Sequence, residues 1–199
     1  MGELQLFNIN EIKNNYNLDI FIETGTGDAT SLKHVIDNSN FENYFSVEIY
    51  KPLADLAKEK FKNKNNVEII NQNSSDGLIS IFKKIETDKK ILFWLDAHFP
   101  GADFGGPNTY KSITEKHLRI PLENEIKIIK EHRKDCLDFY IIDDLRIYED
   151  GNYEAGNWED RKLYGGDGIQ FIYDSFNETH EIKKIYNHQG YILLIPKGV

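Results

Sequence analysis

Runs of apolar residues alternate along the chain with segments whose apolar residues recur at helical spacing. Five apolar runs are each followed by such a segment, and they span residues 19–23, 44–48, 67–71, 91–96 and 139–144. This alternation is typical of a parallel sheet with helices on both faces. Two further strand-like runs, 180–186 and 191–196, are separated only by NHQG and must pair as a hairpin. The pattern predicts an α/β fold with a seven-stranded, mostly parallel sheet and an antiparallel carboxyl-terminal hairpin.

Local signals place the ends of the helices and the long loops. Pro52 suits the first turn of the helix that follows the second strand. Asp76 or a preceding serine is expected to cap the helix after the third strand. The glycine-containing segment 99–118 and the segment 145–167 are long for connections in a compact domain, and both leave the same edge of the predicted sheet. These two loops are expected to form a binding pocket.

Composition and charge narrow the class of protein. The chain has 199 residues, of which 40% are hydrophobic, and we expect one domain spanning residues 1–199. A formal net charge of −9 repels nucleic-acid phosphates and anionic lipid, so neither nucleic acid nor membrane is an expected partner. No apolar run approaches the length of a membrane span, and the start lacks the layout of a signal peptide. The single cysteine, Cys136, cannot form an internal disulfide, which favours a reducing, cytoplasmic location.

Polar and acidic residues follow the predicted strands at their carboxyl ends, where open α/β sheets bind ligands. Any one of them alone is typical of a helix cap or a turn. Their convergence on one edge predicts a binding site, and the residues are Glu23, Glu48, Asn71, Ser74, Ser75, Asp96, Asp143 and Asp144.

The stretch ETGTGD, residues 23–28, is a glycine-rich turn between a strand and a helix. Gly25 and Gly27 permit a ligand to approach the backbone closely. The last glycine of the dinucleotide fingerprint would fall at Thr30, and a glutamate precedes the glycines, so the turn disfavours a diphosphate and favours a cationic or hydroxylated ligand. Glu48, at the end of the second strand, suits the two hydroxyls of a ribose.

The acidic residue, glycine-rich turn, second-strand acid and closing hairpin together resemble the Rossmann-like class I S-adenosylmethionine-dependent methyltransferases over nearly the whole chain. Ala29 departs from the family motif, which often has a glycine there. The resemblance implies S-adenosylmethionine as cofactor, with the methionine portion along the glycine turn, the ribose at the second-strand acid and the adenine beside the two serines. The residues so implied are Glu23, Thr24, Gly25, Gly27, Glu48, Ser74 and Ser75.

Asp96, Asp143 and Asp144 end the fourth and fifth strands and can meet in one cleft if these strands are neighbours. Clustered carboxylates repel one another unless a cation neutralises them, and oxygen ligands favour Mg²⁺, with Mn²⁺ or Ca²⁺ as alternatives. The arrangement resembles the metal-dependent O-methyltransferases of the catechol type and the sugar-modifying type. The competing interpretation is a helix cap at Asp96 and an Asx-turn at Asp143 and Asp144.

His98, two residues beyond Asp96, is the candidate general base, because imidazole titrates near working pH. Asp96 is assigned a catalytic role as well, since a metal there lowers the pKa of an acceptor hydroxyl. The lysine base of the catechol-type enzymes has no counterpart, because Pro100 and Gly101 occupy its vicinity. The alternative for His98 is a supporting or donor-contacting residue.

These features predict a methyltransferase that uses S-adenosylmethionine and a divalent metal to methylate a hydroxyl of a small molecule, a sugar or glycan precursor. Loop residues suited to a sugar or a flat phenol support the acceptor, and they include Arg146, Tyr148, Tyr153, Trp158 and Tyr164. The same aromatic residues are also suited to burying a second subunit in a homo-oligomer.

Two other functions remain open at this point. WLDAH also resembles the Asp-Ala-His motif of the arginase-like metal-dependent hydrolases, although Pro100 stands where their motif has an aspartate. A non-catalytic nucleoside-binding module would retain the glycine turn but leave the acidic residues without a purpose. Metal dependence separates the catalytic interpretation from the binding one.

Overall fold

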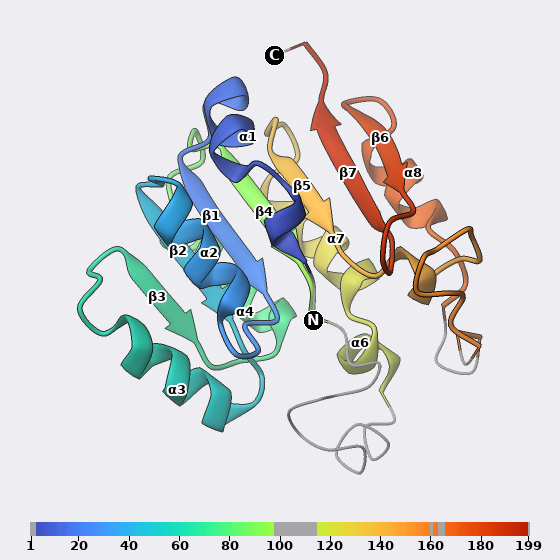
Figure 1. The fold of residues 1–199 in the computed structure, drawn as a ribbon. Coiled ribbons are helices and arrows are strands. Elements are labelled where there is room, and N and C mark those ends of the chain that lie inside the picture. The colour runs from blue at the N-terminus through green and yellow to red at the C-terminus, as the bar shows by residue number, and fades with distance from the viewer. Residues whose placement is uncertain (1–2, 98–114, 160, 163–165, 199) are drawn as a thin grey trace.

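One seven-stranded sheet organises the computed structural model, which describes residues 3–97, 115–159, 161–162 and 166–198 (Figure 1). The strand order is β3-β2-β1-β4-β5-β7-β6, and β7 runs antiparallel to both of its neighbours while the other pairs are parallel. The predicted fold class is confirmed. The strands are β1 (Ile20–Thr24), β2 (Asn43–Val47), β3 (Val67–Ile70), β4 (Ile91–Leu95), β5 (Phe139–Ile142), β6 (His180–Ile185) and β7 (Tyr191–Pro196).

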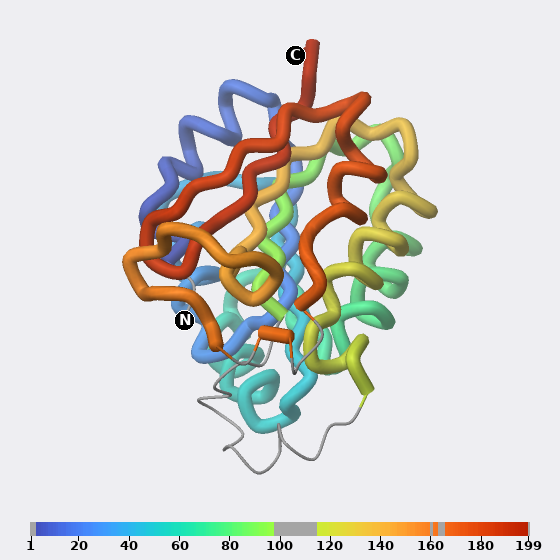
Figure 2. The backbone as a smooth tube through the Cα atoms, turned by 90° about the vertical axis from the view of Figure 1, so that its right-hand side faces the viewer, coloured from blue at the N-terminus to red at the C-terminus, as the bar shows by residue number. Residues whose placement is uncertain are grey.

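Helices pack against both faces of the sheet, and Figure 2 shows these layers edge-on. One face is covered by α1, α2 and α3, whereas α4, α7 and α8 cover the other. Residues of β4 alternate between the two cores: Trp94 packs with the first group and Phe93 with the second, and both are fully buried. The helices are α1 (Ile9–Tyr16), α2 (Thr30–Asn38), α3 (Lys51–Phe61), α4 (Ser74–Phe82), α6 (Lys116–Arg119), α7 (Leu122–His132) and α8 (Gln170–Phe176), with short 3-10 turns η1 (Leu4–Leu6) and η2 (Leu145–Ile147).

The strand register brings four strand ends to one level. Thr24 of β1 pairs with Val47 of β2 and with Leu95 of β4, and Leu95 in turn pairs with Ile142 of β5. The chain moves outward from β1 to β3 and then returns to β4, so β1 and β4 flank the point where the strand order reverses. Ligands of open α/β sheets bind outside the carboxyl ends of the strands at such a point.

The helix boundaries match the sequence prediction with three differences, the first being the helix α6 (Lys116–Arg119), which begins inside the predicted loop 99–118. Pro52 lies in the first turn of α3, as expected. The cap of α4 is Asn73, whose Oδ1 accepts from the Asp76 backbone N–H at 3.0 Å, so the prediction of Asp76 or a serine as the cap was wrong. The helix α1 was not predicted. Asn8 caps it through a bond from the Glu11 N–H at 3.1 Å.

Within the described ranges, every helix is too short or too polar to cross a lipid bilayer.

Candidate functional site

The glycine turn after β1 lies directly against the end of β4. Gly25 has a φ of +86° and Gly27 a φ of +53°, both in the left-handed region that favours glycine. The Gly25 N–H donates to the Val47 carbonyl at 2.9 Å. A Cβ placed on Gly25 would lie 2.4 Å from the carbonyl oxygen of Asp96, much closer than any contact allows. Only glycine at this position therefore lets the turn approach the acidic edge of β4.

Glu23 is fully buried in β1, immediately before this turn. Its Oε2 accepts from Ser46 Oγ at 2.6 Å, and Ser46 Oγ is also 2.6 Å from Thr26 Oγ1. Its Oε1 is buried and has no hydrogen-bond partner within the described chain. Burial disfavours the charged carboxylate and raises the pKa of Glu23 to about 8. Glu23 therefore holds a proton near neutral pH and can change its charge when a cationic ligand arrives.

Glu48 fastens the glycine turn to the end of β2. Its Oε2 accepts from the Gly27 N–H at 2.9 Å and its Oε1 from the Tyr50 N–H at 2.8 Å. Burial raises the pKa of this carboxyl, and the two backbone N–H bonds partly oppose that rise. Because each carboxylate oxygen has a second lone pair, these bonds leave acceptor capacity for two ligand hydroxyls.

Residues after β3 support the same edge in different ways. Asn71 Nδ2 donates to the carbonyls of Glu48 and Ile49, at 2.8 and 3.1 Å, so this side chain braces the turn. Ser74 begins α4 and is buried. Ser75 Oγ accepts from Asn124 Nδ2 of α7 at 2.6 Å. Ser75 therefore links two helices, and its hydroxyl proton is still available to a ligand.

The three predicted metal ligands come together at the ends of β4 and β5. One oxygen from each of Asp96, Asp143 and Asp144 lies within 4.8 Å of the other two. Asp144 has a φ of +52°, and its N–H donates to Asp143 Oδ1 at 2.8 Å. This contact is to the next residue, whereas an Asx-turn joins the side chain to the N–H two residues on. Arg146 Nε lies 3.6 Å from Asp144 Oδ1 and supplies part of the balancing charge. An all-oxygen cluster of this kind fits a hard divalent ion such as Mg²⁺.

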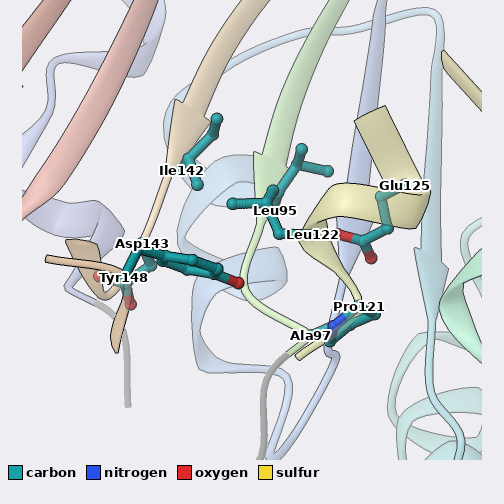
Figure 3. A pocket seen from close by; sticks show the side chains of 8 residues that line it. All are labelled: Leu95, Ala97, Pro121, Leu122, Glu125, Ile142, Asp143 and Tyr148. Atoms are coloured by element: carbon teal, nitrogen blue, oxygen red, sulfur yellow. The ribbon is translucent and has the colours of Figure 1, made fainter. Parts of the chain in front are cut away.

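A hollow adjoins this cluster on the α7 side of the sheet (Figure 3). Asp143 belongs to both the cluster and the hollow, so the hollow borders the carboxylates. The side chains of Glu125 and Tyr148 point into it (Figure 3). The lining residues are Leu95, Ala97, Pro121, Leu122, Glu125, Ile142, Asp143 and Tyr148.

Comparison with solved structures places this architecture among known folds. A candidate caffeoyl-CoA O-methyltransferase from Staphylococcus aureus has a TM-score of 0.66 and 14% identity, covering 98% of this chain and 84% of that chain. An O-methyltransferase from Bacillus cereus, in complex with S-adenosylhomocysteine, has a TM-score of 0.63 and 14% identity over 99% of this chain and 82% of that chain. The chain has the class I methyltransferase fold.

A third methyltransferase structure, from Podospora anserina and bound to S-adenosylhomocysteine, has a TM-score of 0.60 and 12% identity. The alignment covers 95% of this chain and 76% of that chain. By sequence, no family model and no curated protein matches the chain. The resemblance to class I methyltransferases is thus confirmed at the level of the fold.

In this methyltransferase fold, most of the predicted site residues lie along one edge. Glu23, Thr24, Gly25, Gly27 and Glu48 surround the turn after β1 and the end of β2. His98, the candidate base, lies outside the described residues, as do Tyr164 and most of the loop 99–118. Its catalytic role stays a prediction.

The described part of the second predicted loop packs largely against the carboxyl-terminal hairpin. Tyr153 is buried and packs against Tyr186, with ring centroids 5.4 Å apart. Arg146 Nη2 donates to Gln189 Oε1 at 2.6 Å. These contacts hold the loop against the turn between β6 and β7. Tyr148 is the described aromatic residue of this loop that lines the hollow.

Sequence reasoning missed Glu125, a buried residue of the hollow. Acidic residues in the first turn of a helix usually face solvent, so the residue type alone does not point to burial. A signal was present: Leu122, Glu125 and Ile129 follow the i, i+3, i+7 spacing of one helix face. A carboxylate on the apolar face of a helix is unusual and marks a position to inspect.

Proposed function

We propose that the protein is an O-methyltransferase that depends on S-adenosylmethionine and a divalent metal and acts on a hydroxyl of a small molecule. One observation carries the proposal: the glycine turn is in contact with Asp96, a member of the three-aspartate cluster. A donor held along the turn would therefore have its methyl group next to an acceptor held at the carboxylates. The neighbours from S. aureus and B. cereus, both described as O-methyltransferases, support transfer to oxygen.

The donor would lie along the ends of β1, β2 and β3. S-adenosylhomocysteine in the B. cereus and P. anserina structures supports this choice of cofactor. The Thr24–Gly27 turn would line its methionine portion, and Glu23 behind the turn would interact with the ammonium group. Glu48 would accept from the ribose hydroxyls, while Ser74 and Ser75 would lie beside the adenine. Each of these assignments matches a residue at the edge described above.

Asp96, Asp143 and Asp144 would hold the metal, which when bound supplies the positive charge that lowers the pKa of the acceptor hydroxyl. In the reaction the acceptor oxygen bonds to the methyl carbon as the bond from that carbon to the donor sulfur breaks. The sulfonium becomes a neutral thioether, and the hydroxyl proton passes to a base. We assign that base to His98, two residues after Asp96.

A sugar or glycan precursor in the cytoplasm is our proposal for the acceptor. Its support is the resemblance to sugar-modifying enzymes, together with the aromatic face of Tyr148 in a hollow that carboxylates border. The arginase-like alternative has less support. Within the described ranges, the aspartate trio is the sole group of three or more His, Cys, Asp or Glu residues placed to hold a metal.

Calorimetric titration with S-adenosylhomocysteine tests the donor site, and titration with Mg²⁺ tests the carboxylates. We expect the wild-type protein to bind the nucleoside in the micromolar range, with Mg²⁺ or with a chelator. Asp143→Asn should lower Mg²⁺ affinity by at least about tenfold and abolish turnover, since it removes a charged ligand. Its affinity for S-adenosylhomocysteine should change by less than about threefold.

Asp55→Asn is the matched control, because Asp55 is an exposed aspartate of α3 that pairs with Lys51 and does not belong to the cluster of three aspartates. Asp55→Asn should retain the wild-type affinities for S-adenosylhomocysteine and for Mg²⁺. If the wild-type protein binds no S-adenosylhomocysteine under either condition, the methyltransferase proposal is wrong. If Asp143→Asn loses both ligands equally, the separation of donor and metal sites is wrong.

A further inference from the structure

Ala29, where the glycine turn enters α2, has a backbone conformation that suits glycine better than alanine. Its φ of +59° and ψ of +33° lie in the left-handed region, where the Cβ of an L-residue crowds the carbonyl that follows. Gly25 and Gly27 also have a positive φ, but glycine has no Cβ to crowd. An interaction that holds Ala29 in this conformation would therefore stabilise the turn as a whole.

The alanine side chain has a packing role that glycine could not fill. Ala29 is only 1% exposed and belongs to the core on the α1, α2 and α3 face of the sheet. Its carbonyl accepts from the Lys33 N–H at 3.1 Å, a bond at the start of α2. The methyl group thus fills core space, whereas the backbone carries the conformational cost. The conformation of Ala29 also sets the direction in which the turn continues into the helix.

Lys60, near the end of α3, binds the carbonyl groups on both sides of the Ala29 dihedral angles. Its Nζ donates to the Asp28 carbonyl at 3.1 Å and to the Ala29 carbonyl at 3.3 Å. The two peptide planes that carry these oxygens are rigid, and only φ and ψ of Ala29 lie between them. A single ammonium group that binds both oxygens therefore restrains both angles at once.

Other contacts place this ammonium group and hold the opposite side of the turn. Lys60 Nζ lies 5.7 Å from the centroid of the Phe61 ring, and Phe61 is buried in the same core as Ala29. Glu48 accepts from the Gly27 N–H at 2.9 Å. A carboxylate after β2 thus holds an N–H of the turn, and an ammonium group on α3 holds two of the carbonyls that follow it.

We propose that Lys60 is a positioning residue of the donor site, whose ammonium group keeps Ala29 left-handed and so keeps the glycine turn in the shape that receives S-adenosylmethionine. This inference rests on the proposed function, because it takes the turn to be the donor site. In this role Lys60 acts through the backbone and not by contact with the donor. The need for lysine arises from the alanine and would disappear with glycine at position 29.

A double-mutant cycle between Lys60 and Ala29 tests the proposal. Calorimetry measures the dissociation constant of S-adenosylhomocysteine for the wild type, Lys60→Met, Ala29→Gly and the double variant. We expect Lys60→Met to weaken binding by about fivefold when position 29 keeps its alanine, because the turn then spends less time in the competent conformation. In the Ala29→Gly protein the same substitution should change affinity by less than about twofold, since glycine adopts this conformation without help.

Lys58→Met is the matched control, because it removes the same charge from another exposed lysine in the last turn of α3. It should leave the affinity within about twofold of the wild type. An effect of charge alone, or of a weakened fold, would be the same with alanine and with glycine at position 29.

A second measurement needs no ligand. The Cα and Cβ chemical shifts of Ala29 depend on its φ and ψ, and NMR of the labelled full chain records them. These shifts should move in Lys60→Met and stay in place in Lys58→Met.

The proposal is overturned if Lys60→Met weakens binding equally with alanine and with glycine at position 29, if it leaves the affinity of the alanine protein unchanged, or if the Ala29 chemical shifts do not move. Failure of the proposed function has a different signature. In that case the wild-type protein would bind no S-adenosylhomocysteine, while the Ala29 chemical shifts would still respond to Lys60→Met.

Discussion

Single residues decide how closely the two halves of the site approach each other, and Gly25 is the clearest case. Alanine at this position would combine an unfavourable backbone conformation with a Cβ 2.4 Å from the Asp96 carbonyl oxygen. We expect Gly25→Ala to lower the free energy of unfolding by about 3 kcal/mol and to reduce S-adenosylhomocysteine affinity by at least about tenfold. Urea denaturation and calorimetry measure the two effects.

Gly156 provides the control for Gly25 because it has a similar φ of +75° but nothing within 4 Å of an added Cβ. Gly156→Ala should therefore lower the free energy of unfolding by about 1 kcal/mol, the cost of the unfavourable backbone conformation alone. It should leave S-adenosylhomocysteine affinity unchanged. If Gly25→Ala and Gly156→Ala lowered the free energy of unfolding equally, close packing of Gly25 against Asp96 would not be what requires glycine in the turn.

The raised pKa of Glu23 leads to a prediction about how stability depends on pH. Its pKa rises from an ordinary 4.5 to about 8 in the folded chain, so between these values the native state holds a proton that the unfolded state has lost. The contribution of Glu23 to stability is therefore full below pH 4.5 and is lost as the pH rises towards 8, by at most about 1.4 kcal/mol per unit. Glu23→Gln cannot ionise and escapes this loss.

Urea denaturation of both proteins at pH 5, 6, 7 and 8 measures the effect. The variant should gain stability relative to the wild type as the pH rises, by more than about 1 kcal/mol over this range. Parallel pH profiles would contradict the burial of an uncharged carboxyl at this position.

At the scale of elements, a buried ion pair joins the end of α7 to the beginnings of β4 and β5. Arg133 Nε donates to Asp138 Oδ2 at 2.6 Å, and Asp138 Oδ1 also accepts from the Ile91 N–H at 2.9 Å. Arg133→Met would leave the buried Asp138 carboxylate without its cation, so we expect a loss of about 3–5 kcal/mol in chemical denaturation. The pair lies at the amino ends of the strands, opposite the site, so S-adenosylhomocysteine affinity should not change.

Lys51→Met tests the same chemistry on the surface, where Lys51 pairs with Asp55 and both side chains are exposed. Lys51→Met should lower the free energy of unfolding by less than about 1 kcal/mol, because solvent screens exposed ion pairs. A cost for Arg133→Met as small as that for Lys51→Met would show that the buried pair does not hold these elements together.

The elements themselves were largely predictable because their apolar patterns are regular. All seven strands were found within a residue or two of their ends, since the sheet is covered on both faces and its central strands β1, β4 and β5 are buried along their whole length. The helix α1 was missed because it has few apolar residues, and only Ile9 is buried in it. The cap of α4 was misassigned because Asn73 stands among several residues that can cap, and backbone angles decide between them.

At the scale of the whole molecule, topology explains why distant residues could be grouped from the sequence. Parallel strands bring their carboxyl ends to one edge, so Asp96 and Asp143 were expected to be neighbours once β4 and β5 were adjacent. No comparable rule predicts which residues of two helices come into contact. The bond between Asn124 and Ser75 depends on how α7 packs against α4 and was invisible in the pattern.

The position of β7 between β5 and β6 has a consequence for synthesis of the chain. β6 leaves the ribosome before β7 but has no strand to pair with until β7 has docked on β5. Until then the edge of β5 presents unpaired backbone groups, which is the kind of surface that joins chains into aggregates. The nascent protein therefore depends on its last described strand for protection, and a stalled or shortened product would expose the middle of its own sheet.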